Sequence, residues 1–355
     1  MTAPLSEGLR FSPEERLLQH SATRIVVIEE LRIAFLPIPK SGCTSMLWTL
    51  AELAGVPRTA FVGSHQPEVT RALAIHNMRR WRPANRWREH SEERRQEILA
   101  DDTWLRFSIV RDPVARLWSA WQSKLLLHEP RFVERFGAEP WFPRVPRTVE
   151  EIVTDFRAFV AALDVPHHEA PHDAHWGSQS GLLAGFRPTW VGRAEAPAAS
   201  LVRLREHLES VGVDPRRVSD DVPRENANPL PFHPAVHDHR SAAIAAEVYA
   251  DDLAAWGYAA PRPEEPGGAD WETWTARARR RLRLVNELIE RHLRIGELLV
   301  ELEREKARAN AAEADVEAMR SSTSWRLTAP LRRLRSGLIP ALDSAERPVT
   351  EGTAE

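Results

Sequence analysis

The sequence predicts an α/β fold of three layers around a central parallel sheet, followed by a C-terminal helical extension. Two stretches carry this prediction, residues 33–54 and residues 104–127, because each contains an apolar strand, a short loop and a helix with an apolar face. Strands that are apolar along most of their length are typical of a parallel sheet covered on both faces. A proline-free, strongly charged run at 271–320 predicts the extension.

The other elements follow from hydrophobic periodicity and from the positions of proline and glycine. In chain order, strands are expected at 24–28, 33–36, 104–110 and 189–192. Helices are expected at about 46–54, 91–100, 114–127, 148–163, 198–211 and 241–256. The stretches 130–147, 164–181 and 220–240 are expected to be irregular. The expected division is an N-terminal segment at 1–20, a main domain at 21–260, a linker at 261–270, a long helix at 271–320 and a partly disordered tail at 321–355.

The long helix at 271–320 has an apolar seam on alternating three- and four-residue spacings. The seam consists of Val285, Leu288, Ile295, Leu299 and Leu302, with His292 at one apolar position. Such a seam predicts either a short coiled coil, through which the chain would form a homo-oligomer, or a helix that packs on the main domain.

The composition excludes several classes of protein. Hydrophobic residues make up 43% and charged residues 28%, as in ordinary globular domains, and the net charge of −3 gives no argument for nucleic-acid binding. Cys43 is the only cysteine, which excludes an intramolecular disulfide and a cysteine-based zinc site. There is no apolar run of about twenty residues and no signal-peptide pattern, so we expect no membrane span and a cytoplasmic location.

The loop at 37–45 has the features of an anion-binding site. It joins an apolar strand to a helix, and the N–H groups at a helix N-terminus are unpaired and lie at the positive end of the helix dipole. Lys40 adds a full positive charge, and Thr44 and Ser45 add hydroxyl donors. The same loop is compatible with an ordinary turn in which a serine or threonine caps the helix.

A second loop follows the strand at 104–110. Arg111 comes directly after this strand, Pro113 is favoured at a helix start, and Ser119 lies two helical turns further on. Arg111 and Ser119 are therefore candidates for binding a phosphate beside the first loop. Asp112 and Arg116 are expected to form structural ion pairs.

Together the two loops resemble the cofactor motifs of carbohydrate sulfotransferases, the family that sulfates chondroitin, dermatan and related glycans. The resemblance covers about residues 25–260. The first motif is matched by Pro39-Lys40-Ser41-Gly42-Cys43-Thr44, and the second by Val110-Arg111-Asp112-Pro113-Val114-Ala115-Arg116-Leu117-Trp118-Ser119-Ala120-Trp121. Weaker matches follow in the family's order at 175–179, 190–195 and 249–258.

The resemblance implies a P-loop-like sulfotransferase with 3′-phosphoadenosine 5′-phosphosulfate as co-substrate. Lys40 would stabilise charge on the departing phosphate oxygen. Arg111 and Ser119 would hold the 3′-phosphate, and no metal is expected because only one dispersed charge develops on the leaving group. The residues that would hold the 5′-phosphosulfate are Pro39, Lys40, Ser41, Gly42, Cys43, Thr44 and Ser45.

The general base is expected among the histidines, because an imidazole titrates near neutral pH. His76 is the first candidate, since it lies between the two motifs and is followed by Asn77, as in the related enzymes. His175 is the second, with Gln179 one helical turn away, and His65 or a carboxylate is a third alternative. Each histidine is also compatible with a structural role in a loop.

A cluster of histidines at 167–175 invites comparison with a zinc site. It consists of His167, His168, His172 and His175. Pro166 and Pro171 break the helix on which such spacing would bring the rings together, so no metal ligand is expected here.

We therefore expect an enzyme that transfers a sulfuryl group to a hydroxyl of a saccharide or glycoconjugate. The segment 322–332 resembles a tail of bacterial glycosyltransferases that build cell-surface glycans, which favours a location at the periphery of membrane-associated glycan assembly. Two alternatives remain. One is a P-loop kinase that uses ATP and magnesium, and the other is a catalytically inactive glycan-binding scaffold that oligomerises through 271–320.

Overall fold

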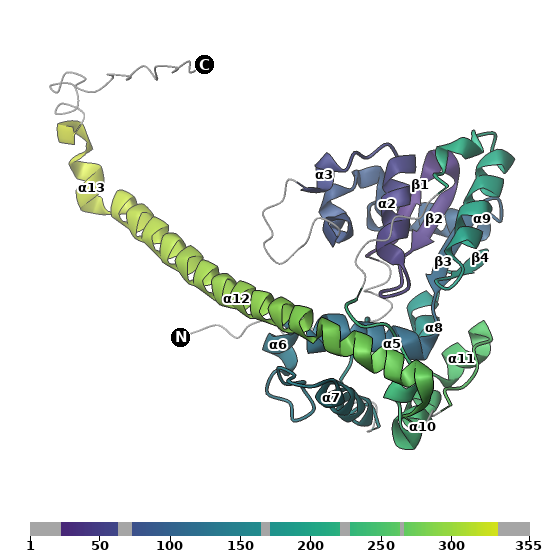
Figure 1. Ribbon diagram of the computed structural model, residues 1–355. Coiled ribbons are helices and arrows are strands. Elements are labelled where there is room, and N and C mark those ends of the chain that lie inside the picture. The colour runs from purple at the N-terminus through teal and green to yellow at the C-terminus, as the bar shows by residue number, and fades with distance from the viewer. Residues whose placement is uncertain (1–22, 63–72, 165–170, 221–227, 263–265, 333–355) are drawn as a thin grey trace, which may run out of the picture. The chain divides into compact units, whose positions relative to one another are not determined.

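The computed structural model describes residues 23–62, 73–164, 171–220, 228–262 and 266–332. The chain divides into two compact units, Met1–Gly296 and Glu297–Glu355. The first unit contains the sheet, most of the helices and the candidate site (Figure 1).

The sheet has four strands in the order β1-β2-β3-β4. Its strands are β1 (Val26–Ile28), β2 (Ile33–Leu36), β3 (Leu105–Val110) and β4 (Trp190–Arg193). The first two form an antiparallel hairpin, in which Val26 pairs with Phe35, whereas β2, β3 and β4 are parallel to one another. The predicted α/β class with a mostly parallel sheet is therefore confirmed.

Helices cover both faces of this sheet. Phe35 and Phe107 lie on the face covered by α2 (Cys43–Leu53) and α9 (Pro197–Ser210). The alternate strand residues, such as Leu36 and Val110, lie on the face covered by α4 (Glu92–Ala100) and α8 (Gln179–Leu183). Because successive side chains of a strand point to opposite faces, strands this apolar need a helical layer on each side.

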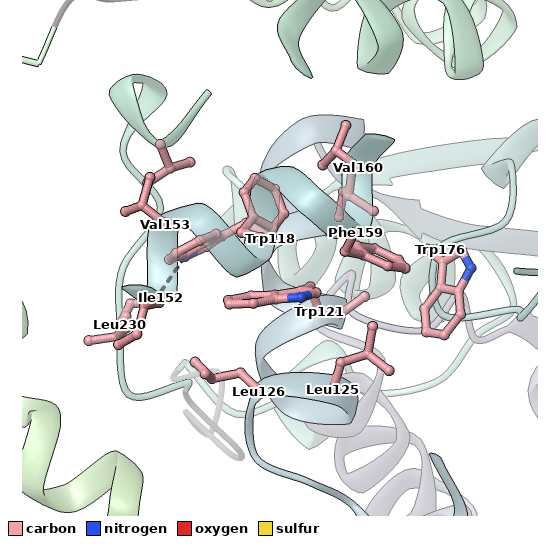
Figure 2. Packing of buried hydrophobic residues seen from close by; sticks show 14 of the residues in the cluster. Trp118, Trp121, Leu125, Leu126, Ile152, Val153, Phe159, Val160, Trp176 and Leu230 are labelled. Atoms are coloured by element: carbon pink, nitrogen blue, oxygen red, sulfur yellow. Dashed lines mark hydrogen bonds between the residues drawn. The ribbon is translucent and has the colours of Figure 1, made fainter. Parts of the chain in front are cut away.

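A second core forms among helices beside the sheet. Trp118 and Trp121 of α5 stack with ring centroids 5.4 Å apart (Figure 2). Phe156 packs edge-on against Trp118. The helices of this core are α5 (Pro113–Trp121), α6 (Pro130–Phe136), α7 (Val149–Ala161), α10 (His239–Val248), α11 (Ala250–Trp256) and the first part of α12 (Gly268–Ser321). A π-helical turn, Gln122–Leu126, continues α5.

The remaining elements are short. They are the helices α3 (Thr59–Val62) and α13 (Thr323–Leu327) and the 3₁₀ turns Glu29–Leu31, Leu73–His76, Met78–Arg80, Pro83–Asn85, Trp87–Glu89, Pro215–Arg217 and Pro234–Val236. No helix in the described part of the chain is both long and apolar enough to cross a membrane.

Two expectations about single elements were wrong. The stretch 130–147 was expected to be irregular, but Pro130 occupies the first turn of α6, where its fixed φ is favourable, and Phe132 and Phe136 are buried. The single helix expected at 241–256 is interrupted at Tyr249, whose side chain is buried and whose hydroxyl donates to the carbonyl of Trp176.

The first part of α12 packs on the main domain, which was one of the two alternatives for this helix. Trp274, Val285 and Ile289 are buried in the helical core, and His292 bonds through Nδ1 with the carbonyl of Leu127 (2.6 Å). The boundary between the two compact units falls within α12, after Gly296. The coiled coil remains a prediction for the part of α12 beyond that boundary.

Candidate active site

The two sequence motifs meet at one edge of the sheet. The loop after β2 contains Lys40, and Arg111 follows the end of β3. These strands are parallel neighbours, so their loops leave the sheet at the same edge, where α/β proteins bind ligands. Arg111 Nη1 donates a hydrogen bond to the carbonyl oxygen of Lys40 (3.2 Å), which joins the two loops directly.

Gln179, the first residue of α8, connects both loops a second time. Its Oε1 accepts from Ser41 Oγ (3.2 Å) and from the backbone N–H of Arg111 (2.9 Å). Its Nε2 donates to the carbonyl oxygen of Arg111 (2.8 Å). The carboxylate of Asp252 in turn accepts from the backbone N–H of Gln179 (2.7 Å) and fixes the start of α8. The sequence placed Gln179 one turn after His175 but did not reveal this bridging role.

The conformation of the first loop leaves the start of α2 open to a ligand. Gly42 is the N-cap residue of α2, with φ of 80°, and no side chain caps the helix there. A Cβ at Gly42 would meet no atom within 4 Å, so backbone conformation rather than space favours glycine. Because no serine or threonine caps the helix, the ordinary capped turn is not what this loop forms, and the first N–H groups of α2 remain available for an anion.

Arg116 holds the loop from inside the protein. It is fully buried and donates to the carbonyl oxygens of Pro39 (2.9 Å), Ala174 (2.8 Å) and Gly177 (2.7 Å). The expected ion pairing with Asp112 was wrong. The Asp112 carboxylate instead caps α5 by accepting from the N–H groups of residues 114 and 115, and backbone carbonyls satisfy the guanidinium.

The side chain of Lys40 is partly buried among other cations. Its Nζ has no hydrogen-bond or ion-pair partner among the described residues. Burial, together with the nearby charges of Lys124 and Arg111, lowers the pKa of Lys40 to about 7. Lys124 comes from the π-helical turn after α5 and pairs with Glu129 at 2.5 Å. The sequence did not identify Lys124, because nothing in its neighbourhood along the chain signals that it lies near Lys40.

The two candidate bases both lie near this cationic centre. His76 Nε2 is 2.9 Å from Thr44 Oγ1, in the first turn of α2. His175 Nδ1 is 2.5 Å from Asp173 Oδ1, a pairing that orients the ring. Burial lowers the pKa of each histidine to about 3, and the charges of Lys124 and Lys40 contribute in both cases. Both rings are therefore neutral near pH 7 in the unliganded protein.

The second motif is supported by residues from the later, weaker matches. The N–H of Asp112 donates to Glu195 Oε1 (2.8 Å), and the hydroxyl of Tyr258 donates to Glu195 Oε2 (2.9 Å). Ser119 Oγ accepts from Asn228 Nδ2 (2.8 Å), which leaves its own proton free to donate to a ligand. No hydrogen bond joins Ser119 to Arg111 in the described chain.

Three of the histidines named from the sequence lie outside the described residues: His65, His167 and His168. Within the described ranges, no group of three or more histidine, cysteine, aspartate or glutamate side chains is placed to hold a metal ion.

The fold and the site define an α/β protein in which two loops, carrying Lys40 and Arg111, meet where two neighbouring parallel strands end. Residues 23–220, more than half of the chain, match the model of the sulfotransferase family, and the chain belongs to that family. A comparison with curated proteins and with solved structures gives no significant match. The protein is thus a sulfotransferase-family enzyme, and membership implies sulfuryl transfer from 3′-phosphoadenosine 5′-phosphosulfate.

Proposed function

We propose that this enzyme transfers a sulfuryl group to a hydroxyl of a saccharide or glycoconjugate, and that the cradle around Lys40 is its active site. The observation that carries the proposal is the direct connection of the two motifs. Arg111 donates to the Lys40 carbonyl, and Gln179 bonds to both loops. A donor with phosphates at two ends needs two binding loops held at a fixed separation, and this arrangement supplies them.

The first loop fits the 5′-phosphosulfate end of the donor. Within the described part of the chain, the N–H groups at the start of α2 and the ammonium of Lys40 are donors without acceptors, which is what a multiply charged anion requires. In this proposal Pro39 shapes the loop, the backbone amides of 41–45 bind oxygens, and Lys40 stabilises the charge that develops on the leaving phosphate.

The second loop fits the 3′-phosphate. Arg111 is charged, and only one of its donors is used by the Lys40 carbonyl. The hydroxyl of Ser119 still has its proton to donate. Glu195 and Tyr258 hold the backbone next to Arg111, so the guanidinium is positioned before a ligand arrives.

Two histidines are proposed to receive the proton of the acceptor hydroxyl. His76, the first candidate, adjoins the first turn of α2 through Thr44. His175 has the better-oriented ring, because Asp173 holds Nδ1 and leaves Nε2 as the acceptor, as the carboxylate does in hydrolase triads. If His76 is the base, His76→Ala will lower kcat more than His175→Ala does; the reverse order assigns the proton transfer to His175.

The saccharide acceptor is supported by the resemblance of segment 322–332 to tails of glycan-building glycosyltransferases.

The test of the proposed function is to incubate the protein with radiolabelled donor and with glycan and lipid extracts. We expect label in a saccharide-containing fraction without added magnesium, and none with Lys40→Ala, whose circular dichroism should match the wild type. Label in non-saccharide molecules alone would contradict the acceptor class. Phosphate transfer from ATP with magnesium would support a kinase, and no transfer at all would support a binding scaffold.

A further inference from the structure

A second unpaired cation lies beside the first loop. Arg24 precedes β1 by two residues, and Val26 at the start of β1 pairs with Phe35 near the end of β2. The hairpin therefore brings Arg24 close to Pro37, where the anion-binding loop begins. Neither motif of the family resemblance contains Arg24, which lies 16 residues before Lys40 in the sequence.

The guanidinium of Arg24 has no hydrogen-bond or ion-pair partner among the residues that the structure describes. Its side chain is partly buried. Arg116, the other arginine behind the loop, is by contrast satisfied by three carbonyl oxygens. A partly buried guanidinium without acceptors is costly unless a ligand supplies them, because its five donors lose water without replacement.

The effects of Arg24 on nearby pKa values agree with the position that the hairpin register gives it. Its charge is the largest nearby cation acting on the pKa of His76, ahead of Lys124 and Lys40. His76 in turn contacts Thr44, and Arg24 also acts on the thiol of Cys43. Cys43 and Thr44 are the first two residues of α2. The β1 hairpin therefore brings a second cation, besides Lys40, close to residues that surround the open start of α2.

We propose that Arg24 is a further ligand of the donor, binding an anionic oxygen of its 5′-phosphosulfate end at the start of α2. This inference rests on the proposed function of the same cradle. The planar guanidinium can offer two parallel N–H groups to one phosphate or sulfate group, which the single ammonium of Lys40 cannot do. An anionic group on the acceptor would satisfy the same guanidinium, so the test must separate the two sources.

Two nucleotides distinguish them in a calorimetric titration. Adenosine 3′,5′-bisphosphate carries a 5′-phosphate, and adenosine 3′-monophosphate lacks it. We expect Arg24→Ala to weaken binding of the bisphosphate about tenfold or more and binding of the monophosphate less than about twofold, since the charge-assisted hydrogen bonds to the 5′-phosphate are lost only with the former. Arg24→Lys, which keeps the charge without the fork, should lie between wild type and Arg24→Ala. Arg88→Ala removes an exposed arginine that bonds to Glu89 and should change neither affinity.

The outcomes separate the inference from the function on which it depends. Wild-type protein that binds neither nucleotide would overturn both. Wild-type binding of the bisphosphate with equal affinity in Arg24→Ala would overturn only the inference, and a raised KM for the acceptor in that variant would assign Arg24 to the acceptor instead. Equal weakening for both nucleotides would show a structural role. If Arg24→Ala does not fold, Arg24→Lys decides the question through the same ratio of affinities.

Discussion

Lys40 is surrounded by positive charge before any ligand is present. Lys124 and Arg111 act on its ammonium, and burial removes water that would stabilise the charged form, so its pKa falls from 10.5 to about 7. A bound dianion would raise the pKa of Lys40 again, because its negative charge stabilises the protonated amine. Ligand binding and proton uptake at Lys40 are therefore linked.

The first prediction follows from that linkage. Lys40 is protonated below about pH 7 and neutral above it in the unliganded enzyme, so affinity for adenosine 3′,5′-bisphosphate should fall as the pH rises. Between pH 7 and pH 9 we expect a loss of about tenfold to a hundredfold, measured by calorimetry. Lys40→Arg, which stays charged at every pH, should flatten the profile. A wild-type affinity that is constant over this range would show that Lys40 is protonated in the free enzyme.

The second prediction concerns Lys124. Its charge is the largest nearby charge that lowers the pKa of Lys40, so Lys124→Met should raise that pKa and shift the fall in affinity to higher pH. Burial remains in the variant, so the shift is partial. Lys306→Met is the matched control, because Lys306 is an exposed lysine that pairs with Glu303 on α12. An unchanged profile in Lys124→Met would remove Lys124 from the electrostatics of the site.

At the scale of single residues, the sequence predicted those site residues that belong to a motif at the end of a strand. Lys40 and Arg111 stand next to strand ends, and their motifs predicted that they would meet. Lys124 and Arg24 could not be predicted in the same way, since each reaches the cradle through packing of separate elements. Their charges become relevant only when α5 and the β1 hairpin are placed in space.

Among the elements, α8 has an importance that its length of five residues does not suggest. Ser178 N-caps it, Asp252 of α11 fixes its first N–H groups, and Gln179 then bonds to both loops of the site. The weak sequence matches at 175–179 and 249–258 thus meet behind the cradle. The two segments are some seventy residues apart in the sequence, and the carboxylate of Asp252 joins them by accepting from the N–H of Gln179.

The third prediction tests this support. Gln179→Ala removes three hydrogen bonds and leaves buried donors and acceptors of Ser41 and Arg111 without partners. We expect a loss of stability of about 2–4 kcal/mol in urea unfolding and a weakening of bisphosphate binding by about tenfold or more. Ser180→Ala, a neighbour on α8 whose buried hydroxyl has no partner, is the control and should be close to neutral. Retained nucleotide affinity in a destabilised Gln179→Ala would mean that the loops hold their geometry without it.

The prediction of elements succeeded where one face of a helix or a whole strand is apolar. It missed α6, because the prolines of 130–147 outweighed the buried Phe132 and Phe136 in a periodicity argument. It also missed the π-helical turn at Gln122–Leu126, since an extra residue in a turn leaves no compositional trace. That turn carries Lys124.

At the scale of the whole molecule, α12 contributes to two different parts of the chain. Up to Gly296 its apolar residues Val285 and Ile289 are part of the helical core, with no exposed surface. Beyond it, Leu298, Val300 and Leu302 are each 40% exposed or more. Of the seam recognised in the sequence, Val285 is buried, Leu288, Ile295 and Leu299 are half-buried, and Leu302 is 44% exposed, although the spacing is the same throughout.

The last prediction separates these two parts with the same substitution. Val285→Asp places a carboxylate without a partner in the core, which costs several kcal/mol, so we expect loss of cooperative folding of the first unit in thermal unfolding followed by circular dichroism. Leu302→Asp changes a side chain that is 44% exposed and should leave that transition unchanged. If the exposed part of α12 forms the predicted coiled coil, Leu302→Asp will also reduce the mass measured by light scattering to that of one chain, because a charge at a seam position opposes association. A wild-type protein that already has the mass of one chain would contradict the coiled coil and leave packing on the helical core as the role of this seam.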